Sequence, residues 1–296
     1  MSTTSSPGSG ASCSSSPERA VRAGRDGQLR LAFASRAGRT VLTGRRFTLP
    51  LQALEPMDLT GDGSATLLLL NPTGGVLAGD RLDTEVTLGP GCRVCLSTPS
   101  ATRVYRSPGA VAIQRTSIAL GSGATLEWVP DHLIPSPGAR LRQETVITMA
   151  PDATLLYLDA WATGRLARGE RWGFDLLDTS LLIRDPAGAL LRERAILDGP
   201  PPRDGLGGTE GFGYVATFVA ARPDRPGWDN LAWQLQDAGA RAASGSRSGV
   251  STLARGGLVV RLLCPSAPAL RACADALWST LRRRLLGLGP LDLRKL

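Results

Sequence analysis

Three stretches of this sequence repeat one pattern: Val86-Thr-Leu-Gly-Pro-Gly-Cys-Arg-Val94, Ile118-Ala-Leu-Gly-Ser-Gly-Ala-Thr-Leu126 and Ile147-Thr-Met-Ala-Pro-Asp-Ala-Thr-Leu155. Each joins two short apolar segments through a turn of small residues. A weaker copy is Leu182-Ile-Arg-Asp-Pro-Ala-Gly-Ala-Leu190. Apolar and polar residues alternate on both sides of Gly, Pro and Asp, which predicts a strand, a turn and a second strand in each copy.

The copies recur at intervals of about 30 residues, which is typical of units that each bury one face on the next. We therefore predict a mainly β protein, a layered β-helix-like body or elongated sandwich of stacked strand pairs. The strand-and-turn pattern extends from about residue 27 to residue 197. Plain hairpins of an antiparallel sandwich are the alternative that the pattern leaves open.

Two helices are predicted near the C-terminus. Apolar residues at helical spacing follow Trp228, with Asp229 or Asn230 as the N-cap and Gly239 as the stop. The second helix spans about residues 266–286, and Gly287 ends it. Its apolar stripe is Leu270, Ala274, Leu277, Leu281 and Leu285, and its last turns carry the arginines at 282–284. This helix is a natural docking element, or its stripe simply covers the β core.

The ends of the chain predict its domain organisation and location. Residues 1–18 are rich in Ser, Gly and Pro and contain no apolar core of a secretory signal, so we expect residues 1–20 to form a disordered tail. Residues 21–296 are expected to form a single β domain with C-terminal helices. No apolar run approaches the about 20 residues of a membrane span, so we expect a cytoplasmic protein with no membrane partner.

Composition excludes several classes of enzyme. The 296 residues include one histidine, His132, and one lysine, Lys295. One histidine cannot form an H-E-x-x-H zinc site, no G-x-S-x-G elbow occurs, and Lys295 does not stand in a phosphate-binding G-K-[ST] motif. The net charge of +8 leaves a basic nucleic-acid-binding β module open, but the arginines are scattered and no strand carries base-stacking aromatics in pairs.

Five cysteines are too few and odd in number for a disulfide framework in a chain of this length. Cys92 and Cys95 form a C-x-x-C pair without a second pair at zinc spacing. In an extended strand, residues three apart face opposite sides, so we expect two diverging, buried thiols.

Four segments contain the candidate functional residues: Asn71–Leu82, Ser97–Ser107, Trp128–Ile134 and Gly164–Trp172. The first has adjacent glycines, which permit close backbone approach, and Asp80, which either serves a site or caps backbone N–H groups. The third places His132 beside a carboxylate, although a lone histidine in an apolar stretch is more often structural.

These segments, in this order, resemble the UreD (also called UreH) family of urease accessory proteins. The residues that carry the resemblance are Pro72, Gly74, Gly75, Gly79, Asp80, Arg103, Tyr105, Trp128, Pro130, Gly164, Gly169 and Glu170. It covers roughly residues 27–290. The chain departs from the family pattern at Thr73, at Asp131-His132, at Pro135-Ser-Pro137 and at Arg103, which replaces a frequent lysine.

The resemblance implies a layered β-helix-like protein that is not an enzyme. It implies binding to apo-urease and to the accessory protein UreF, which recruits the GTPase UreG, and nickel delivery into urease driven by GTP hydrolysis. It also implies nickel in transit along a water-filled path, with no tightly bound cofactor. Carboxylate and imidazole ligands suit Ni²⁺, so Asp80, His132 and Glu170 are candidates for weak transit contacts.

One enzymatic alternative stays open at this point. A carbohydrate-active hydrolase on a β-solenoid would need two carboxylates facing one groove. Asp80, Asp131, Glu144 and Glu170 could supply such a pair. The aromatic content of 5% argues against a sugar-binding groove.

Overall fold

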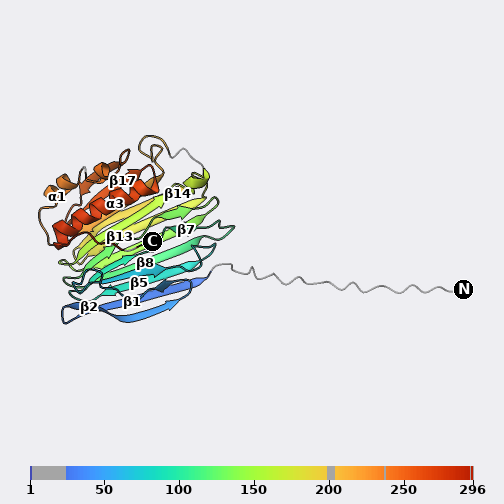
Figure 1. Cartoon of the computed structure of the whole chain (residues 1–296). Helices are drawn as coiled ribbons and strands as arrows, with labels where there is room; N and C mark the ends of the chain where they lie inside the picture. The colour runs from blue at the N-terminus through green and yellow to red at the C-terminus, as the bar shows by residue number, and fades with distance from the viewer. Residues whose placement is uncertain (2–24, 199–203, 237, 294, 296) are drawn as a thin grey trace.

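The repeated units build two facing β-sheets, whose strands form a diagonal stack in Figure 1. The computed structural model describes residues 1, 25–198, 204–236, 238–293 and 295. The tail predicted over residues 1–20 therefore lies outside the described residues, except for Met1.

The first sheet has seven strands, in the spatial order β14-β13-β11-β8-β5-β1-β2. Their bounds are β1 Asp26–Arg36, β2 Arg39–Thr48, β5 Arg81–Leu88, β8 Ala112–Leu120, β11 Arg140–Met149, β13 Leu176–Asp185 and β14 Gly188–Asp198. From β1 to β13 the neighbours in this sheet run parallel, and only the hairpin partners β2 and β14 at its edges are antiparallel.

The second sheet has ten strands, of which eight follow the order β16-β17-β15-β12-β9-β6-β4-β3. Their bounds are β3 Gln52–Ala53, β4 Ala65–Leu70, β6 Arg93–Ser97, β9 Thr125–Trp128, β12 Thr154–Ala162, β15 Tyr214–Ala221, β16 Arg247–Thr252 and β17 Gly257–Cys264. The short strands β7 Thr102–Val104 and β10 Leu133–Pro135 pair beside β12.

Each of the three strong repeats crosses from the first sheet to the second, which confirms the stacked-layer prediction. The chain passes from β5 to β6, from β8 to β9 and from β11 to β12. Successive turns stack through backbone hydrogen bonds: Gly121 N–H donates to the Leu88 carbonyl at 2.8 Å, and Ala150 N–H to the Leu120 carbonyl at 2.9 Å. Because the turns repeat, the strands that flank them pair parallel and in register.

The last residue of each turn is small and fully buried: Cys92, Ala124 and Ala153. The fourth, weaker copy forms a plain hairpin instead, in which β13 and β14 pair within the same sheet. Its turn is tight because Asp185 accepts a hydrogen bond from the Ala187 N–H at 2.9 Å and pairs directly with Gly188. The plain-hairpin alternative therefore applies only to the weak fourth copy, and the three strong copies form parallel stacked layers.

Both predicted helices are present: α1 Trp228–Leu235 and α3 Ala267–Leu281, the latter continued by the π-helical segment η2 Arg282–Leu286. Ser266 caps α3 by accepting a hydrogen bond from the Ala269 N–H. The predicted cap and stop of α1 are wrong. Gly227, with φ 80°, precedes α1, while Gly239 lies inside the short helix α2 Ala238–Ala242.

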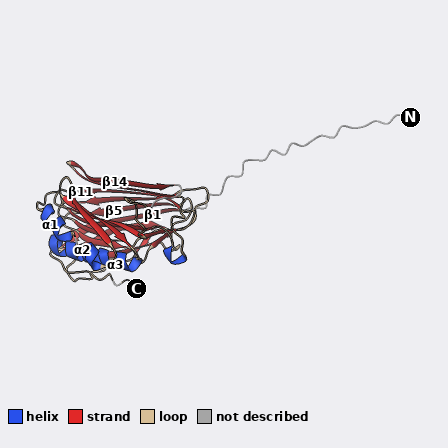
Figure 2. Ribbon diagram, turned by 90° about the horizontal axis from the view of Figure 1, so that it is seen from above, coloured by secondary structure: helices blue, strands red, loops and turns tan. Residues whose placement is uncertain are grey.

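The helices cover one sheet only. Figure 2 shows α1, α2 and α3 on one side of the molecule and β1, β5, β11 and β14 on the other. The apolar stripe of α3 packs on buried residues of the ten-stranded sheet, among them Leu258, Val260 and Leu262. The outer face of the seven-stranded sheet is polar, and cross-strand ion pairs such as Arg30–Glu85 and Arg115–Glu144 lie along it.

The two cysteines of the C-x-x-C pair diverge as predicted. Cys92 belongs to the apolar cluster between the sheets, and Cys95 to the cluster beneath α3. Burial raises the pKa of both thiols, most strongly that of Cys95. Cys92, Cys95, Cys264 and Cys273 are all buried free thiols.

None of the helices in the described part of the chain combines the length and the apolar composition that crossing a bilayer requires.

Candidate functional site

The space between the sheets changes from apolar to polar along the strands. Near the turns, the inward residues of the seven-stranded sheet form an apolar row, in which Val86, Ile118, Ile147 and Ile183 are neighbours in register. One row further from the turns stand Thr84, Thr116 and Thr145, here called the threonine row. The next row contains Gln114 and Gln143, again side by side, and is called the glutamine row.

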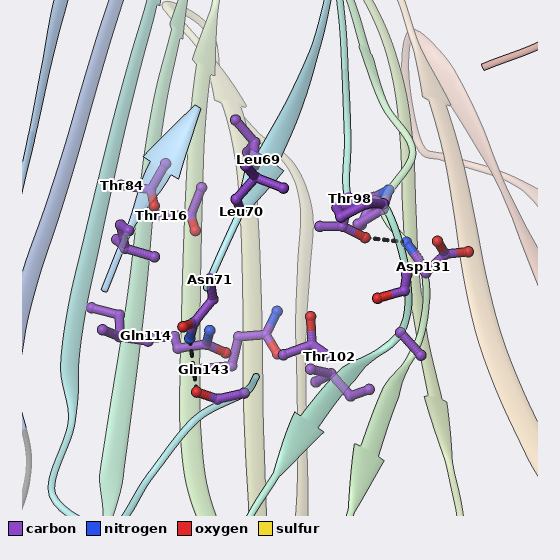
Figure 3. Close-up of a pocket in the computed structure, with 18 of the residues that line it drawn as sticks. Leu69, Leu70, Asn71, Thr84, Thr98, Thr102, Gln114, Thr116, Asp131 and Gln143 are labelled. Atoms are coloured by element: carbon purple, nitrogen blue, oxygen red, sulfur yellow. Dashed lines mark hydrogen bonds between the residues drawn. The ribbon is translucent and has the colours of Figure 1, made fainter. Parts of the chain in front are cut away.

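These polar rows face a cavity of about 270 Å³ between the sheets, shown in Figure 3. Thr84, Thr116, Gln114 and Gln143 line it from the seven-stranded sheet, and Leu69, Trp128 and Asp159 from the ten-stranded sheet. The loops Asn71–Gly75 and Thr98–Thr102 also contribute to its wall. The side-chain oxygen of Gln143 is buried and has no hydrogen-bond partner among the described residues. Side-chain oxygen atoms thus form part of the cavity wall and can bind a small polar ligand.

The glycine-rich loop at this cavity is held by its own residues. The Asn71 amide donates to the Gly75 carbonyl at 2.8 Å, a bond drawn in Figure 3, and Thr73 donates to Asn71 at 2.6 Å. Val76 N–H then donates to the Arg103 carbonyl at 2.8 Å, which joins the loop to the segment that contains Tyr105. Two segments that are distant in the sequence both line the cavity, one through Pro72, Gly74 and Gly75 and the other through Trp128 and Pro130.

Asp159 supplies a carboxylate to the cavity that sequence analysis missed. It lies on β12, in line with the buried inward residues Leu155 and Tyr157. Desolvation, and then the nearby negative charge of Glu193, raise the pKa of Asp159 to about 6. Burial and the charge of Asp159 likewise raise the pKa of the neighbouring phenol of Tyr157.

The raised pKa of Asp159 predicts that the free energy of unfolding depends on pH. A carboxyl whose pKa rises on folding destabilises the protein when ionised, so the penalty is absent below about pH 4 and complete above about pH 6. Asp159→Asn should therefore increase the free energy of unfolding by about 1–3 kcal/mol at about pH 8 and leave it unchanged near pH 4. Urea unfolding at both pH values measures this, with Asp83→Asn on the outer face of β5 as control. An equal effect of Asp159→Asn at both pH values would contradict the assignment.

Asp80 lies fully buried beside this region and caps backbone groups. Its carboxylate accepts hydrogen bonds from the Arg25 N–H at 2.9 Å and the Leu77 N–H at 2.8 Å. It thereby closes the turn that contains Gly79, whose φ is 74°. The capping geometry considered from the sequence is present, and Asp80 does not line the cavity.

Glu170 lies in a separate turn. Arg165 binds both of its carboxylate oxygens, one of them at 2.7 Å. Gly164 precedes this turn with φ 151°, and a Cβ there would approach the Glu170 carbonyl to 2.4 Å. Gly169, with φ 70°, ends the short helix η1 Leu166–Arg168. The neighbouring Arg171 and Trp172 bind Asp204, which lies far away in the sequence.

His132 and Asp131 line a second cavity of about 280 Å³, between α3 and the ten-stranded sheet. The His132 ring stands edge-on to Tyr214, with centroids 5.2 Å apart, and burial lowers the pKa of His132. Lys295 donates to Asp131 at 3.0 Å. Pro130, Asp131 and Ala160 border both cavities, so they form the wall between them.

Asp80, His132 and Glu170 therefore do not converge on one point. Within the described residues, no three His, Cys, Asp or Glu side chains form a group that could hold a metal ion. Any cation in the inter-sheet cavity would meet scattered oxygen atoms rather than a chelating cage.

Comparison with known proteins agrees with the motif order. A family model described as UreD urease accessory protein matches residues 25–295. The chain is 35% identical to the urease accessory protein UreD of Alkalilimnicola ehrlichii, over 96% of this chain and 94% of that protein. It is 37% identical to urease accessory protein UreD 2 of Streptomyces griseus subsp. griseus, over 91% and 93% of the two chains. With UreD of Cupriavidus metallidurans the identity is 34%, over 90% and 92%. The chain belongs to the UreD family of urease accessory proteins.

Proposed function

We propose that this chain is a non-catalytic scaffold subunit that docks on apo-urease and, with UreF and the GTPase UreG, supports GTP-dependent nickel insertion. Family membership over residues 25–295 supports a role in urease maturation. The single observation that supports nickel passage is the inter-sheet cavity with its threonine and glutamine rows and Asp159. We further propose a cytoplasmic location and no resident cofactor.

The oxygen atoms that line the cavity favour weak, transient binding of Ni²⁺ over tight binding. Ni²⁺ binds tightly where several imidazole or thiolate ligands converge, and more weakly to hydroxyl, amide and single carboxylate oxygens. The lining supplies the second kind: the hydroxyls of Thr84 and Thr116, the amide of Gln143 and the carboxylate of Asp159. Contacts of the cation with Asp80, His132 and Glu170 stay a prediction.

The two alternatives have less support. The aspartates that line the inter-sheet cavity are Asp131 and Asp159, and Asp131 is bound by Lys295, which disfavours a free pair of carboxylates for glycoside hydrolysis. On the outer sheet face, several arginines are paired with carboxylates; Arg142 and Arg194, for example, share Asp178. Such pairing lowers the positive potential that phosphate binding needs.

The scaffold role is tested by expressing the urease subunits and the other accessory proteins with and without this chain. We expect urease purified without it to contain far less nickel and to have correspondingly low activity. Equal nickel content and activity in both preparations would refute the proposal. Affinity purification of the tagged chain should also recover apo-urease and UreF.

The passage of nickel through the inter-sheet cavity is tested by a separate experiment. Thr116→Leu adds bulk and removes a hydroxyl in the middle of the threonine row, so it should reduce the nickel content of urease several-fold. Thr87→Leu is the matched control, because Thr87 is exposed on the outer face of β5. If both variants deliver nickel equally well, the cation does not pass between the sheets.

A further inference from the structure

A polar row extends from the cavity to the open side of the sandwich. On the inner face of the ten-stranded sheet, Asp159 on β12 pairs in register with Thr217 on β15, and Thr217 pairs with Arg261 on β17. Neighbouring strands lie about 4.8 Å apart, so the backbones at Asp159 and Arg261 are about 10 Å apart across β15. The long side chain of Arg261 can span much of that separation. Asp159 lines the cavity, whereas Arg261 lies beyond its lining, half-exposed on β17 next to the edge strand β16.

The opposite sheet supplies a second carboxylate at the same place. Glu193 on β14 is next to Leu181, which continues the threonine row from Thr145. Arg261 donates one hydrogen bond to Glu193 and another to the Thr217 hydroxyl at 2.7 Å. The second carboxylate oxygen of Glu193 is buried and accepts no hydrogen bond from the described residues. The guanidinium therefore binds Glu193, a carboxylate close enough to Asp159 for its charge to raise the pKa of Asp159.

We propose that Arg261 is a positioning residue that acts as a built-in counter-ion of the cavity and keeps its affinity for a divalent cation low. This inference rests on the proposed nickel passage. A guanidinium stays protonated at all working pH values and repels an approaching cation, while it occupies an oxygen of Glu193. Without it, the Glu193 carboxylate and the Thr217 hydroxyl would be free to bind a cation beside Asp159, and the cation would be retained rather than passed on.

A second arginine at the same edge offers a matched control. Arg255 binds both oxygens of Asp185 at 2.6 Å and also the Gly188 carbonyl at 3.0 Å. Like Arg261, it joins the two sheets, but it lies at the hairpin turn. The Asp185 carboxylate that it binds is not among the charges that shift the pKa of Asp159, whereas Glu193 is. Loss of Arg255 removes a cross-sheet ion pair without changing the charge beside Asp159.

The test is calorimetric titration of the full-length chain with Ni²⁺ at low salt. Arg261→Met should bind Ni²⁺ about tenfold more tightly than the unsubstituted chain, a change of about 1.4 kcal/mol, because the positive charge that repels the cation is removed. Arg261→Lys should retain weak binding, since the charge remains. Arg255→Met should also bind as the unsubstituted chain does. Adding Asp159→Asn to Arg261→Met should abolish the gain.

The inference is wrong if Arg261→Met binds Ni²⁺ no more tightly than Arg255→Met, or if the gain survives Asp159→Asn. Thermal unfolding of both arginine variants shows whether loss of a cross-sheet ion pair has the same structural cost in each. The maturation assay separates this inference from the proposed function. If urease still requires the chain but Arg261→Met leaves Ni²⁺ binding unchanged, only the role of Arg261 fails. If urease loads nickel without the chain, the proposed function fails.

Discussion

Replacing Arg282 by methionine is expected to lower the free energy of unfolding by about 3–5 kcal/mol, the cost of leaving a buried charge without its partner. Sequence analysis placed Arg282 in an arginine run suited to docking, yet its side chain is only 3% exposed. It forms an ion pair with Glu127 and donates to the Gly289 carbonyl at 2.8 Å. Trp278 donates to the other Glu127 oxygen at 2.6 Å. This cluster joins α3 and the segment after it to β9.

Urea unfolding at neutral pH measures the loss. Arg283→Met is the control, because Arg283 is exposed one residue further on, and it should cost less than about 0.5 kcal/mol. Adding Glu127→Leu to Arg282→Met should recover much of the stability, since an apolar pair needs no counter-ion. Equal costs at positions 282 and 283 would show that the ion pair contributes nothing.

The loss of stability in Arg282→Met should become smaller at low pH. Desolvation raises the pKa of Glu127 even with Arg282 present, and loss of the guanidinium removes a favourable charge and raises it further. A neutral carboxyl needs no counter-ion, so the stability deficit of Arg282→Met should shrink as the pH falls. A deficit independent of pH would indicate lost packing rather than lost charge.

Gly75→Ala is expected to cost about 2–4 kcal/mol, because steric overlap and backbone strain act together. Gly75 has φ 153°, and a Cβ there would approach the Arg103 carbonyl oxygen to 2.4 Å and the Tyr105 ring to 2.9 Å. That carbonyl accepts the Val76 N–H, so relieving the overlap would break the contact between the glycine-rich loop and Arg103. The wall of the inter-sheet cavity would move with the loop.

Gly109→Ala separates the effect of backbone strain from that of steric overlap. Gly109 has φ 82°, but nothing lies within 4 Å of an added Cβ, so only backbone strain of about 1 kcal/mol should remain. Thermal unfolding compares the variants, and nickel delivery to urease should fall for Gly75→Ala alone. Equal loss of stability in both would mean that close approach to Arg103 is not why residue 75 is glycine.

Local sequence patterns were sufficient to predict much of the architecture. The repeated turns, with Cys92, Ala124 and Ala153 as buried last residues, predicted stacked strand pairs, and alternation predicted that Cys92 and Cys95 would diverge. The motif residues also pointed to the right region, since Pro72, Gly75, Trp128 and Pro130 line the cavity. The fourth copy shows the limit, because the same strand–turn–strand pattern serves either a crossing or a hairpin.

The polar interior is the part that the sequence left open. Thr84, Gln143, Asp159 and Glu193 lie in strands, where a polar residue next to an apolar one normally faces solvent. Asp159 lies in β12, which has one face against the opposite sheet and the other beneath α3, so its solvent-facing alternative does not exist. Thr84, Gln143 and Glu193 lie on the inner face of the seven-stranded sheet, where their register with buried apolar neighbours places them inward although the outer face of that sheet is exposed.

The amino-acid sequence by itself determined the strand pairs, their stacking, the C-terminal helices and the family of this protein, because those depend on neighbours within about 30 residues and on the order of motifs. Only the tertiary structure decided which charges meet: Glu127 with Arg282, and Glu193 with Arg261. Those partners are far apart along the chain, and burial sets the strength of their interaction, which no local pattern encodes.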